Sequence, residues 1–171
     1  KLEADLAVQQ AIKTGLNARI IRPSGMFGLF QSQEKFFPKL INLVKSGLPI
    51  TIHGDGEQVR DYSSVEDIAK AIWLLKDTPS GTIVNASNSR PYTLLRMAQI
   101  IAASCKRHKL KPKIVHVADR PNQVQEFLIS HAKINKLCGW KPTKFLENEI
   151  DRMADFYLGI QLPTSKFFYL N

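Results

Sequence analysis

Apolar residues recur along the chain in two patterns, the three- and four-residue spacing of amphipathic helices and the short runs typical of strands. The first pattern predicts helices at residues 2–14, 36–46, 64–75, 93–104, 131–138 and 145–158. The second pattern predicts strands at residues 18–22, 49–53, 82–85, 113–117 and 124–129. Helices and strands alternate throughout the chain, and this alternation predicts an α/β fold.

The helical spacing also predicts which helix faces are buried. Ser64 is suited to begin the third helix, because its hydroxyl can accept a hydrogen bond from a free backbone N–H of the first turn. The residues of that helix that we expect to point inward are Ile68, Ala69, Ile72, Trp73 and Leu75. The apolar residues that fall on one side of the first helix are Leu2, Leu6, Ala7, Ala11 and Ile12.

Composition and charge narrow the class of protein. A chain of 171 residues, 44% hydrophobic and 23% charged, is typical of a folded domain with one core. No apolar run approaches the roughly 18 to 20 residues that span a bilayer, so we expect no membrane partner. The net charge is +9, and +8 of it lies in residues 105–144, which hold ten basic and two acidic residues. This stretch is either a solvated surface or an attractor for phosphate groups.

The cysteines and histidines show no spacing of metal ligands. Cys105 and Cys138 belong to no CxxC or CxxH pattern, and we therefore expect no metal site. Both lie among apolar residues of predicted helices, and we interpret them as reduced, buried thiols of a cytoplasmic protein. The glycines are scattered, so the chain lacks the GxGxxG loop with which dinucleotide-binding folds hold a pyrophosphate.

Two sequence blocks carry a more specific signal. Residues 22–28 are RPSGMFG, and residues 49–69 are PITIHGDGEQVRDYSSVEDIA. Two shorter blocks follow, RPN at 120–122 and GWKP at 139–142. Together they resemble the C-terminal half of an extended short-chain dehydrogenase/reductase of the NAD-dependent nucleotide-sugar epimerase/dehydratase family. The corresponding stretches of that family usually read RPxNxYG, GDGxQxRDxxxVxDxA, RPxD and LGWxP. The resemblance extends from about residue 1 to about residue 158.

The resemblance implies a domain organisation. Residues 1–33 correspond to the final helix and strand of a Rossmann-type doubly wound cofactor domain, whose N-terminal part is absent from this sequence. Residues 34–162 correspond to a small mixed α/β substrate-binding domain, and residues 163–171 are expected to be a tail. The chain has no initiator Met, and we expect it to be part of a longer protein. The missing part is expected to bind most of the cofactor, NAD or NADP.

The resemblance also implies cofactor and phosphate contacts. Lys1 matches the Lys of the family's YxxxK helix, which lowers the pKa of the catalytic Tyr four positions upstream and holds the nicotinamide ribose. Pro23 and Ser24 match the turn that faces the nicotinamide. Arg60 and Arg120 match two arginines that bind the substrate's diphosphate, a role that suits the guanidinium fork. For each of these residues a purely structural or solvated role is the alternative.

Six further positions are expected to border the substrate, and some depart from the family's pattern. Gly25 stands where the family has a substrate-contacting Asn, and Gln123 stands where an Asp commonly binds the nucleotide ribose. His53 stands where an aromatic residue lines the nucleobase pocket, with an ordinary half-buried strand histidine as the alternative. The remaining three are Thr51, Phe36 and Phe37, and we expect at least one of the phenylalanines to pack in the core.

We therefore expect the substrate-binding portion of an NAD(P)-dependent nucleotide-sugar epimerase/dehydratase, which acts through a transient keto-sugar and is inactive as a fragment. The loss of polar groups at positions 25 and 123 keeps two alternatives open, a carbonyl reductase of the same family and a non-catalytic ligand-binding relic. The resemblance also allows a homodimer. The basic stretch lacks interleaved exposed aromatic residues and any recognised motif, so we do not expect a nucleic-acid partner.

Overall fold

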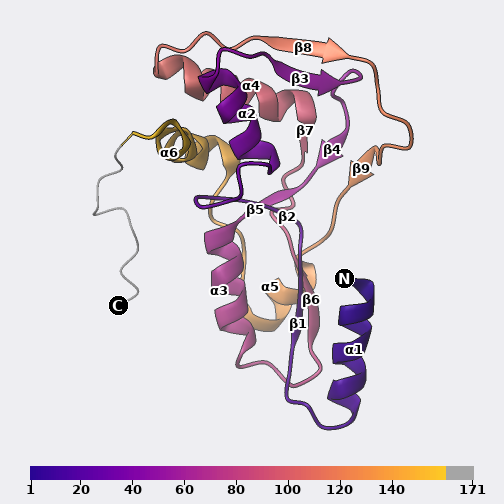
Figure 1. Ribbon diagram of the computed structural model, residues 1–171. Coiled ribbons are helices and arrows are strands. Elements are labelled where there is room, and N and C mark those ends of the chain that lie inside the picture. Colours follow the sequence, from indigo (N-terminus) through magenta and orange to yellow (C-terminus); the bar gives the residue numbers. More distant parts are fainter. Residues whose placement is uncertain (161–171) are drawn as a thin grey trace. The chain divides into compact units, whose positions relative to one another are not determined.

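The structure is a computed structural model that describes residues 1–160, and the tail predicted at 163–171 lies outside the described residues. The chain folds into two compact units, each assembled from segments that are separate in the sequence (Figure 1). Unit 1 comprises Lys1–Met26, Asp61–Pro91 and Phe127–Phe145, and unit 2 comprises Phe27–Arg60, Tyr92–Glu126 and the chain from Leu146 onward. The boundary that the sequence suggests between residues 33 and 34 remains a prediction.

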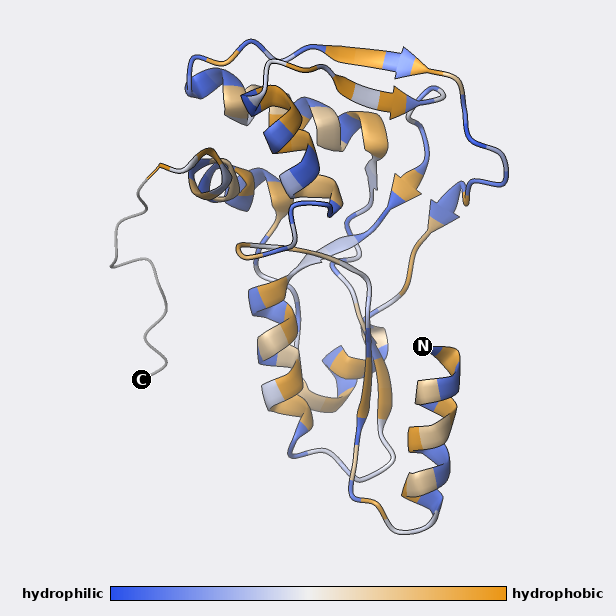
Figure 2. Ribbon diagram, in the orientation of Figure 1, coloured by the Kyte–Doolittle hydropathy of each residue, from blue (hydrophilic) through white to orange (hydrophobic). Residues whose placement is uncertain are grey.

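Unit 1 is organised around two parallel strands, β1 (Ile20–Pro23) and β6 (Ile83–Ala86), which pair along their whole length. The other elements of the unit are α1 (Leu2–Lys13), β2 (Gly25–Phe27), β5 (Tyr62–Ser64), α3 (Val65–Leu75) and α5 (Ala132–Cys138). Its buried core joins α3, β6 and α5, and consists of Ile68, Ala71, Leu75, Val84, Ala86, Ile134 and Trp140. Figure 2 shows hydrophobic residues in both strands, of which Ile20 and Ile21 of β1 are half-buried and Val84 and Ala86 of β6 are buried.

Unit 2 contains a second parallel pair, β3 (Ile50–His53) with β8 (Ile114–Val117), and a three-stranded sheet in the order β7-β4-β9. The strands of that sheet are β7 (Tyr92–Thr93), β4 (Val59–Arg60) and β9 (Glu126–Phe127). Helices α2 (Phe36–Lys45), α4 (Leu94–Arg107) and α6 (Leu146–Leu158) pack against one another. The buried residues of these helices include Phe37, Leu40, Ile41, Met97, Ile101, Ile150 and Met153.

The α/β class predicted from the sequence is confirmed, with parallel strand pairs in both units. The predicted helices and long strands agree with the observed elements to within a few residues at most ends. The structure adds four strands of two or three residues in segments where none was predicted, namely β2, β4, β5 and β7. Strands this short are held by partners distant in the sequence, so they leave little local signal.

The predicted inward face of α3 is only partly confirmed. Ile68 and Leu75 are buried as predicted and share that side with Asp67 and Ala71, whereas Ala69, Ile72 and Trp73 are exposed, the last two to 56% and 68%. Trp73 follows Ile68 by five residues and therefore lies about 140° away around the helix. Lys76 Nζ lies 4.9 Å from the centroid of the Trp73 ring. Helix α1 buries none of its residues fully: on its apolar side Leu2 and Leu6 are 73% and 53% exposed, whereas Ala11 and Ile12 are half-buried.

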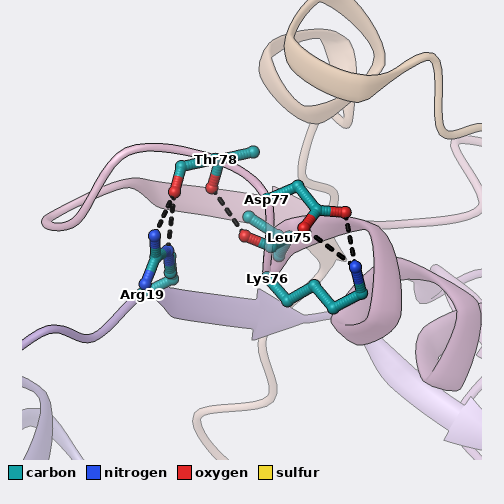
Figure 3. A network of polar contacts seen from close by, with 5 residues as sticks. All are labelled: Arg19, Leu75, Lys76, Asp77 and Thr78. Atoms are coloured by element: carbon teal, nitrogen blue, oxygen red, sulfur yellow. Dashed lines mark hydrogen bonds and ion pairs between the residues drawn. The ribbon is translucent and has the colours of Figure 1, made fainter.

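The C-terminal end of α3 is tied to the start of β1 by polar contacts (Figure 3). Arg19 Nε donates a hydrogen bond of 2.8 Å to the carbonyl oxygen of Thr78, and Thr78 Oγ1 donates one of 2.7 Å to the carbonyl oxygen of Leu75. Lys76 Nζ pairs with the neighbouring Asp77 carboxylate at 2.6 Å. The bond from Thr78 satisfies the Leu75 carbonyl, one of those that a helix leaves free at its last turn, and the bond from Arg19 fixes the turn that follows α3.

The two thiols differ in exposure, and we expect them to differ in reactivity. Cys105 is buried in α4, and burial raises the pKa of its thiol to about 11, whereas Cys138 is half-buried. Only the thiolate reacts, so at pH 8 we expect a maleimide to label Cys138 at least tenfold faster than Cys105. Peptide mass spectrometry after timed labelling measures both rates. In the matched variant Cys138→Ser, labelling should require denaturant; labelling of the folded variant at the rate of the unfolded chain would contradict the prediction.

Among residues 1–160, no helix has both the length and the apolar composition that crossing a bilayer requires.

Candidate functional site

The turn between β3 and β4 requires its glycines. Gly54 and Gly56 have φ angles of +70° and +81°, in the left-handed region that other residues rarely adopt. A Cβ on Gly56 would lie only 2.8 Å from Ile52 Cγ2 and 2.9 Å from Leu95 Cβ. Asp55 Oδ1 accepts a hydrogen bond of 2.9 Å from the backbone N–H of Glu57 and so closes the turn. The Gly-Asp-Gly motif therefore directs the chain into β4 and sets the position of Arg60.

Arg60 is the last residue of β4, and its guanidinium donates hydrogen bonds to main-chain carbonyls. Its Nη2 donates to Val124 O at 2.7 Å, and its Nη1 donates to Val59 O at 2.8 Å and to Gln125 O at 3.4 Å. The backbone N–H of Val59 also donates to Gln125 O at 2.7 Å. Arg60 thus holds residues 118–125, which we call the 118–125 segment, at its C-terminal end.

Arg120 belongs to the 118–125 segment and contacts the end of β3. Its Nη2 donates a hydrogen bond of 2.8 Å to His53 Nε2, while His53 Nδ1 lies 3.2 Å from the carbonyl oxygen of Ala118. The Asp119 carboxylate accepts from the backbone N–H of Arg120 at 2.8 Å and also from the side-chain amide of Gln123. Four sequence-predicted site residues, His53, Arg60, Arg120 and Gln123, therefore lie on or against one segment of unit 2.

The other predicted substrate residues of unit 2 lie elsewhere on its elements. Thr51 is exposed on β3, two residues before His53 and hence on the same face of the strand. Phe37 is buried, with its ring edge-on to Phe27 and Phe36 at centroid distances of 5.9 and 5.2 Å. Phe37 is thus a core residue, as expected for at least one of the pair, and the substrate contacts of both phenylalanines remain predictions.

The predicted cofactor residues lie in unit 1. Pro23 and Ala86 are paired at the carboxyl ends of β1 and β6, which is the edge where dinucleotide folds bind their ligands. Ser24 is buried and its hydroxyl hydrogen-bonds that of Ser63 at 3.0 Å. Lys1 is exposed at the N-terminal end of α1. The cofactor contacts of Lys1, Pro23 and Ser24 remain predictions, and a Gly-rich pyrophosphate loop is absent from the sequence.

Gly25 has a physical reason to lack the side chain that the family carries. A Cβ at this position would lie 2.7 Å from Cδ1 and from Cε1 of the Tyr62 ring, and 3.2 Å from the carbonyl oxygen of Asp61. Contacts below 3 Å force a neighbour to move. The aromatic ring thus leans into the space that an Asn side chain at residue 25 would need.

Sequence reasoning missed a polar cluster in unit 1 that includes Asp61, the residue next to Arg60. Asp61 is buried, and burial raises the pKa of its carboxyl, an effect that backbone hydrogen bonds from Ser89 and Asn88 oppose. Ser89 N donates to Asp61 Oδ2 at 3.1 Å, and Ser89 Oγ lies 2.8 Å from His131 Nδ1. The local signal for this cluster was the presence of Asp61 in the sequence block at residues 49–69.

A second missed residue, Asp67, joins the sequence block at residues 49–69 to the GWKP block at residues 139–142. Its buried carboxylate accepts hydrogen bonds from Thr143 N, Thr143 Oγ1 and Lys144 N at 2.8 to 2.9 Å. Its carbonyl oxygen accepts one from Trp140 Nε1 at 2.9 Å. Asp67 therefore has a structural role. The described part of the chain contains no group of three or more His, Cys, Asp or Glu side chains able to hold a metal ion.

Known proteins resemble this chain in sequence. The dTDP-glucose 4,6-dehydratase of Salmonella typhimurium is 28% identical over 152 residues, which cover 84% of this chain and 42% of that protein. A trifunctional UDP-glucose 4,6-dehydratase/3,5-epimerase/reductase of Arabidopsis thaliana is 33% identical over 146 residues, which cover 84% of this chain and 21% of that protein. The chain thus spans less than half the length of these curated relatives.

The fold is also that of solved enzymes. A variant of UDP-glucuronic acid 4-epimerase from Bacillus cereus superposes with a TM-score of 0.83 at 19% identity, over 94% of this chain and 52% of that one. The superposition shows a shared Rossmann-type fold. The sequence model of the NAD dependent epimerase/dehydratase family matches residues 1–87, just over half of the 171 residues. The chain therefore belongs to the NAD-dependent epimerase/dehydratase family, within the extended short-chain dehydrogenases/reductases.

Proposed function

We propose that this chain is the substrate-binding portion of an NAD(P)-dependent nucleotide-sugar epimerase/dehydratase. The observation that carries the proposal is the placement of Arg60, Arg120 and His53 on or against the 118–125 segment of one compact unit. A guanidinium fork suits the bidentate binding of a diphosphate, the group that all nucleotide sugars share, and here one comes from β4 and one from the 118–125 segment. The excess of basic residues at 105–144 would draw such an anion to the unit.

The proposed reaction passes through a transient keto-sugar. The cofactor, which Lys1, Pro23 and Ser24 would help to hold, would supply a hydride acceptor for a sugar carbon, and the hydroxyl on that carbon would lose its proton to the family's catalytic tyrosine. Lys1 would hold the ribose and, by its positive charge, lower the pKa of a tyrosine that lies upstream of this chain. Pro23 and Ser24, at the carboxyl edge of β1, would form the wall beside the nicotinamide. The diphosphate contacts would position the sugar and take no part in the proton transfer.

The alternatives rest on the two departures from the family pattern. A carbonyl reductase or a non-catalytic ligand-binding relic needs no amide at residue 25, and the Tyr62 ring leans over Gly25 where that amide would stand. A reductase would retain NAD(P) turnover with a non-sugar carbonyl compound, and a relic would bind without turnover. The proposed protein forms a homodimer. It is located in the cytoplasm, where its cysteines stay reduced.

Isothermal titration calorimetry on the full-length protein that carries this chain tests the function. We expect saturable binding of dTDP-glucose, UDP-glucose and the free nucleoside diphosphates, and no binding of glucose, because the diphosphate supplies most of the affinity. Double-stranded DNA at several salt concentrations is the control. Affinity for DNA alone, with the steep salt dependence of phosphate-backbone binding, would contradict the proposal and favour a nucleic-acid partner.

A further inference from the structure

We propose that His53 is a positioning residue that holds the Arg120 guanidinium in place for the substrate's diphosphate. The ligand in this proposal rests on the proposed function, and the His53–Arg120 contact itself rests on the structure. Both side-chain nitrogens of His53 have partners, Nδ1 with Ala118 O at 3.2 Å and Nε2 with Arg120 Nη2 at 2.8 Å. His53 therefore connects the end of β3 to the 118–125 segment through two bonds.

The partners of His53 allow one form of its ring. A backbone carbonyl oxygen can only accept, so the ring nitrogen that faces Ala118 must carry the proton. A guanidinium nitrogen can only donate, so the nitrogen that faces Arg120 must offer its lone pair. Together these contacts specify a neutral imidazole that is protonated on Nδ1. An imidazole in this state orients a guanidinium by accepting a hydrogen bond from it.

The backbone around Arg120 has supports besides His53. The Asp119 carboxylate accepts from the backbone N–H of Arg120 and from the side-chain amide of Gln123, so the residues on both sides of Arg120 are connected. Parallel pairing of β3 with β8 sets His53 opposite Val117, next to the start of the segment. The exposed arginine side chain is the remaining mobile part, and the His53 bond restrains it.

An arginine that is restrained before a ligand binds gives that ligand a higher affinity. Immobilising one long side chain on binding costs enough to weaken a complex by roughly 2- to 10-fold, and a side chain that is already held avoids that loss. The bond to His53 uses one of the five N–H donors of the guanidinium, and the planar fork keeps further donors for phosphate oxygens. A phenylalanine at this position offers no ring nitrogen and cannot hold the arginine in this way.

A double-mutant cycle with uridine diphosphate as the probe, in the full-length protein, tests this role. We expect His53→Phe to weaken binding about 2- to 10-fold, and His53→Gln, whose amide oxygen can accept from Arg120, to restore most of the loss. In an Arg120→Ala background, which should itself weaken binding about 10- to 100-fold, His53→Phe should have no further effect. Equal effects of His53→Phe in both backgrounds would overturn the proposal, since His53 would then contact the ligand directly.

Two observations separate the positioning role from the proposed function. Long-range proton–nitrogen NMR on the ligand-free protein reports the tautomer of His53, and a ring protonated on Nε2 would overturn the contact whatever the ligand is. A protein that shows the Nδ1–H tautomer and yet fails to bind any nucleoside diphosphate would retain the contact and contradict the proposed function. Circular dichroism and thermal unfolding of each variant verify that a lost affinity is not a lost fold.

Discussion

Asp67→Ala is expected to lower the free energy of unfolding by about 3–5 kcal/mol, the largest effect on stability that we expect from a single substitution. Asp67 is 2% exposed, and its carboxylate receives hydrogen bonds from Thr143 N, Thr143 Oγ1 and Lys144 N. Alanine leaves these donors without their acceptor, in a place that water reaches poorly. A hydrogen bond to a charged group contributes roughly 1.5–3 kcal/mol, and bonds to the same carboxylate do not add fully.

The loss is measured by urea unfolding, with the fluorescence of Trp140 as the probe. Trp140 is buried and donates to the Asp67 carbonyl oxygen at 2.9 Å, so its emission reports on the same part of unit 1. The matched control is Asp77→Ala, since Asp77 has a side chain that is 74% exposed and pairs with its neighbour Lys76. We expect the control to lower the free energy of unfolding by less than about 0.5 kcal/mol. Similar losses in both variants would contradict the role of Asp67.

The elements that the sequence predicts correctly have periodic patterns of their own. Helix α4 repeats apolar residues over several turns and begins at Thr93, whose hydroxyl accepts from Arg96 N at 3.1 Å. Strand β4 has only two residues, and its pairing of Val59 with Thr93 joins positions far apart in the sequence. A register of that kind is set by the packing of the whole unit, and no local window contains it.

In the candidate site, too, the sequence predicts features that a local motif records and misses contacts between residues far apart in the chain. The motif block identifies Arg60 and Arg120 as a possible phosphate-binding pair, a role that stays a prediction. The sequence could not show that His53 and Arg120, 67 positions apart, share a hydrogen bond, or that Asp67 bonds to Thr143, 76 positions away. It also could not show why Gly25 replaces an Asn, because the Tyr62 ring that fills the space is 37 positions downstream (62 minus 25). Polar partners depend on the folded path of the chain, whereas motifs record only residue types.

Arg60→Leu is expected to weaken the binding of UDP-glucose about 10- to 100-fold, the largest effect on ligand binding among single changes along with that of Arg120→Ala. Charge-assisted hydrogen bonds to a diphosphate are strong, and leucine removes both the charge and the donors. In the ligand-free structure the guanidinium donates to Val124 O and Gln125 O. A phosphate that binds here must therefore replace or share those carbonyl contacts, whose acceptors carry no charge and attract the guanidinium less than a phosphate does. Calorimetric titration of the full-length protein measures the change.

The controls distinguish a phosphate contact from a structural one. Arg96→Leu removes the same charge from the exposed surface of α4, in the same unit, and should change the affinity less than about twofold. Arg60→Lys keeps the charge without the fork and should recover only part of the affinity. Uridine, which has no phosphate, should bind Arg60→Leu and the unmodified protein equally weakly. If UDP-glucose affinity is the same in Arg60→Leu as in Arg96→Leu, Arg60 serves only to hold the 118–125 segment, and the diphosphate must be bound elsewhere.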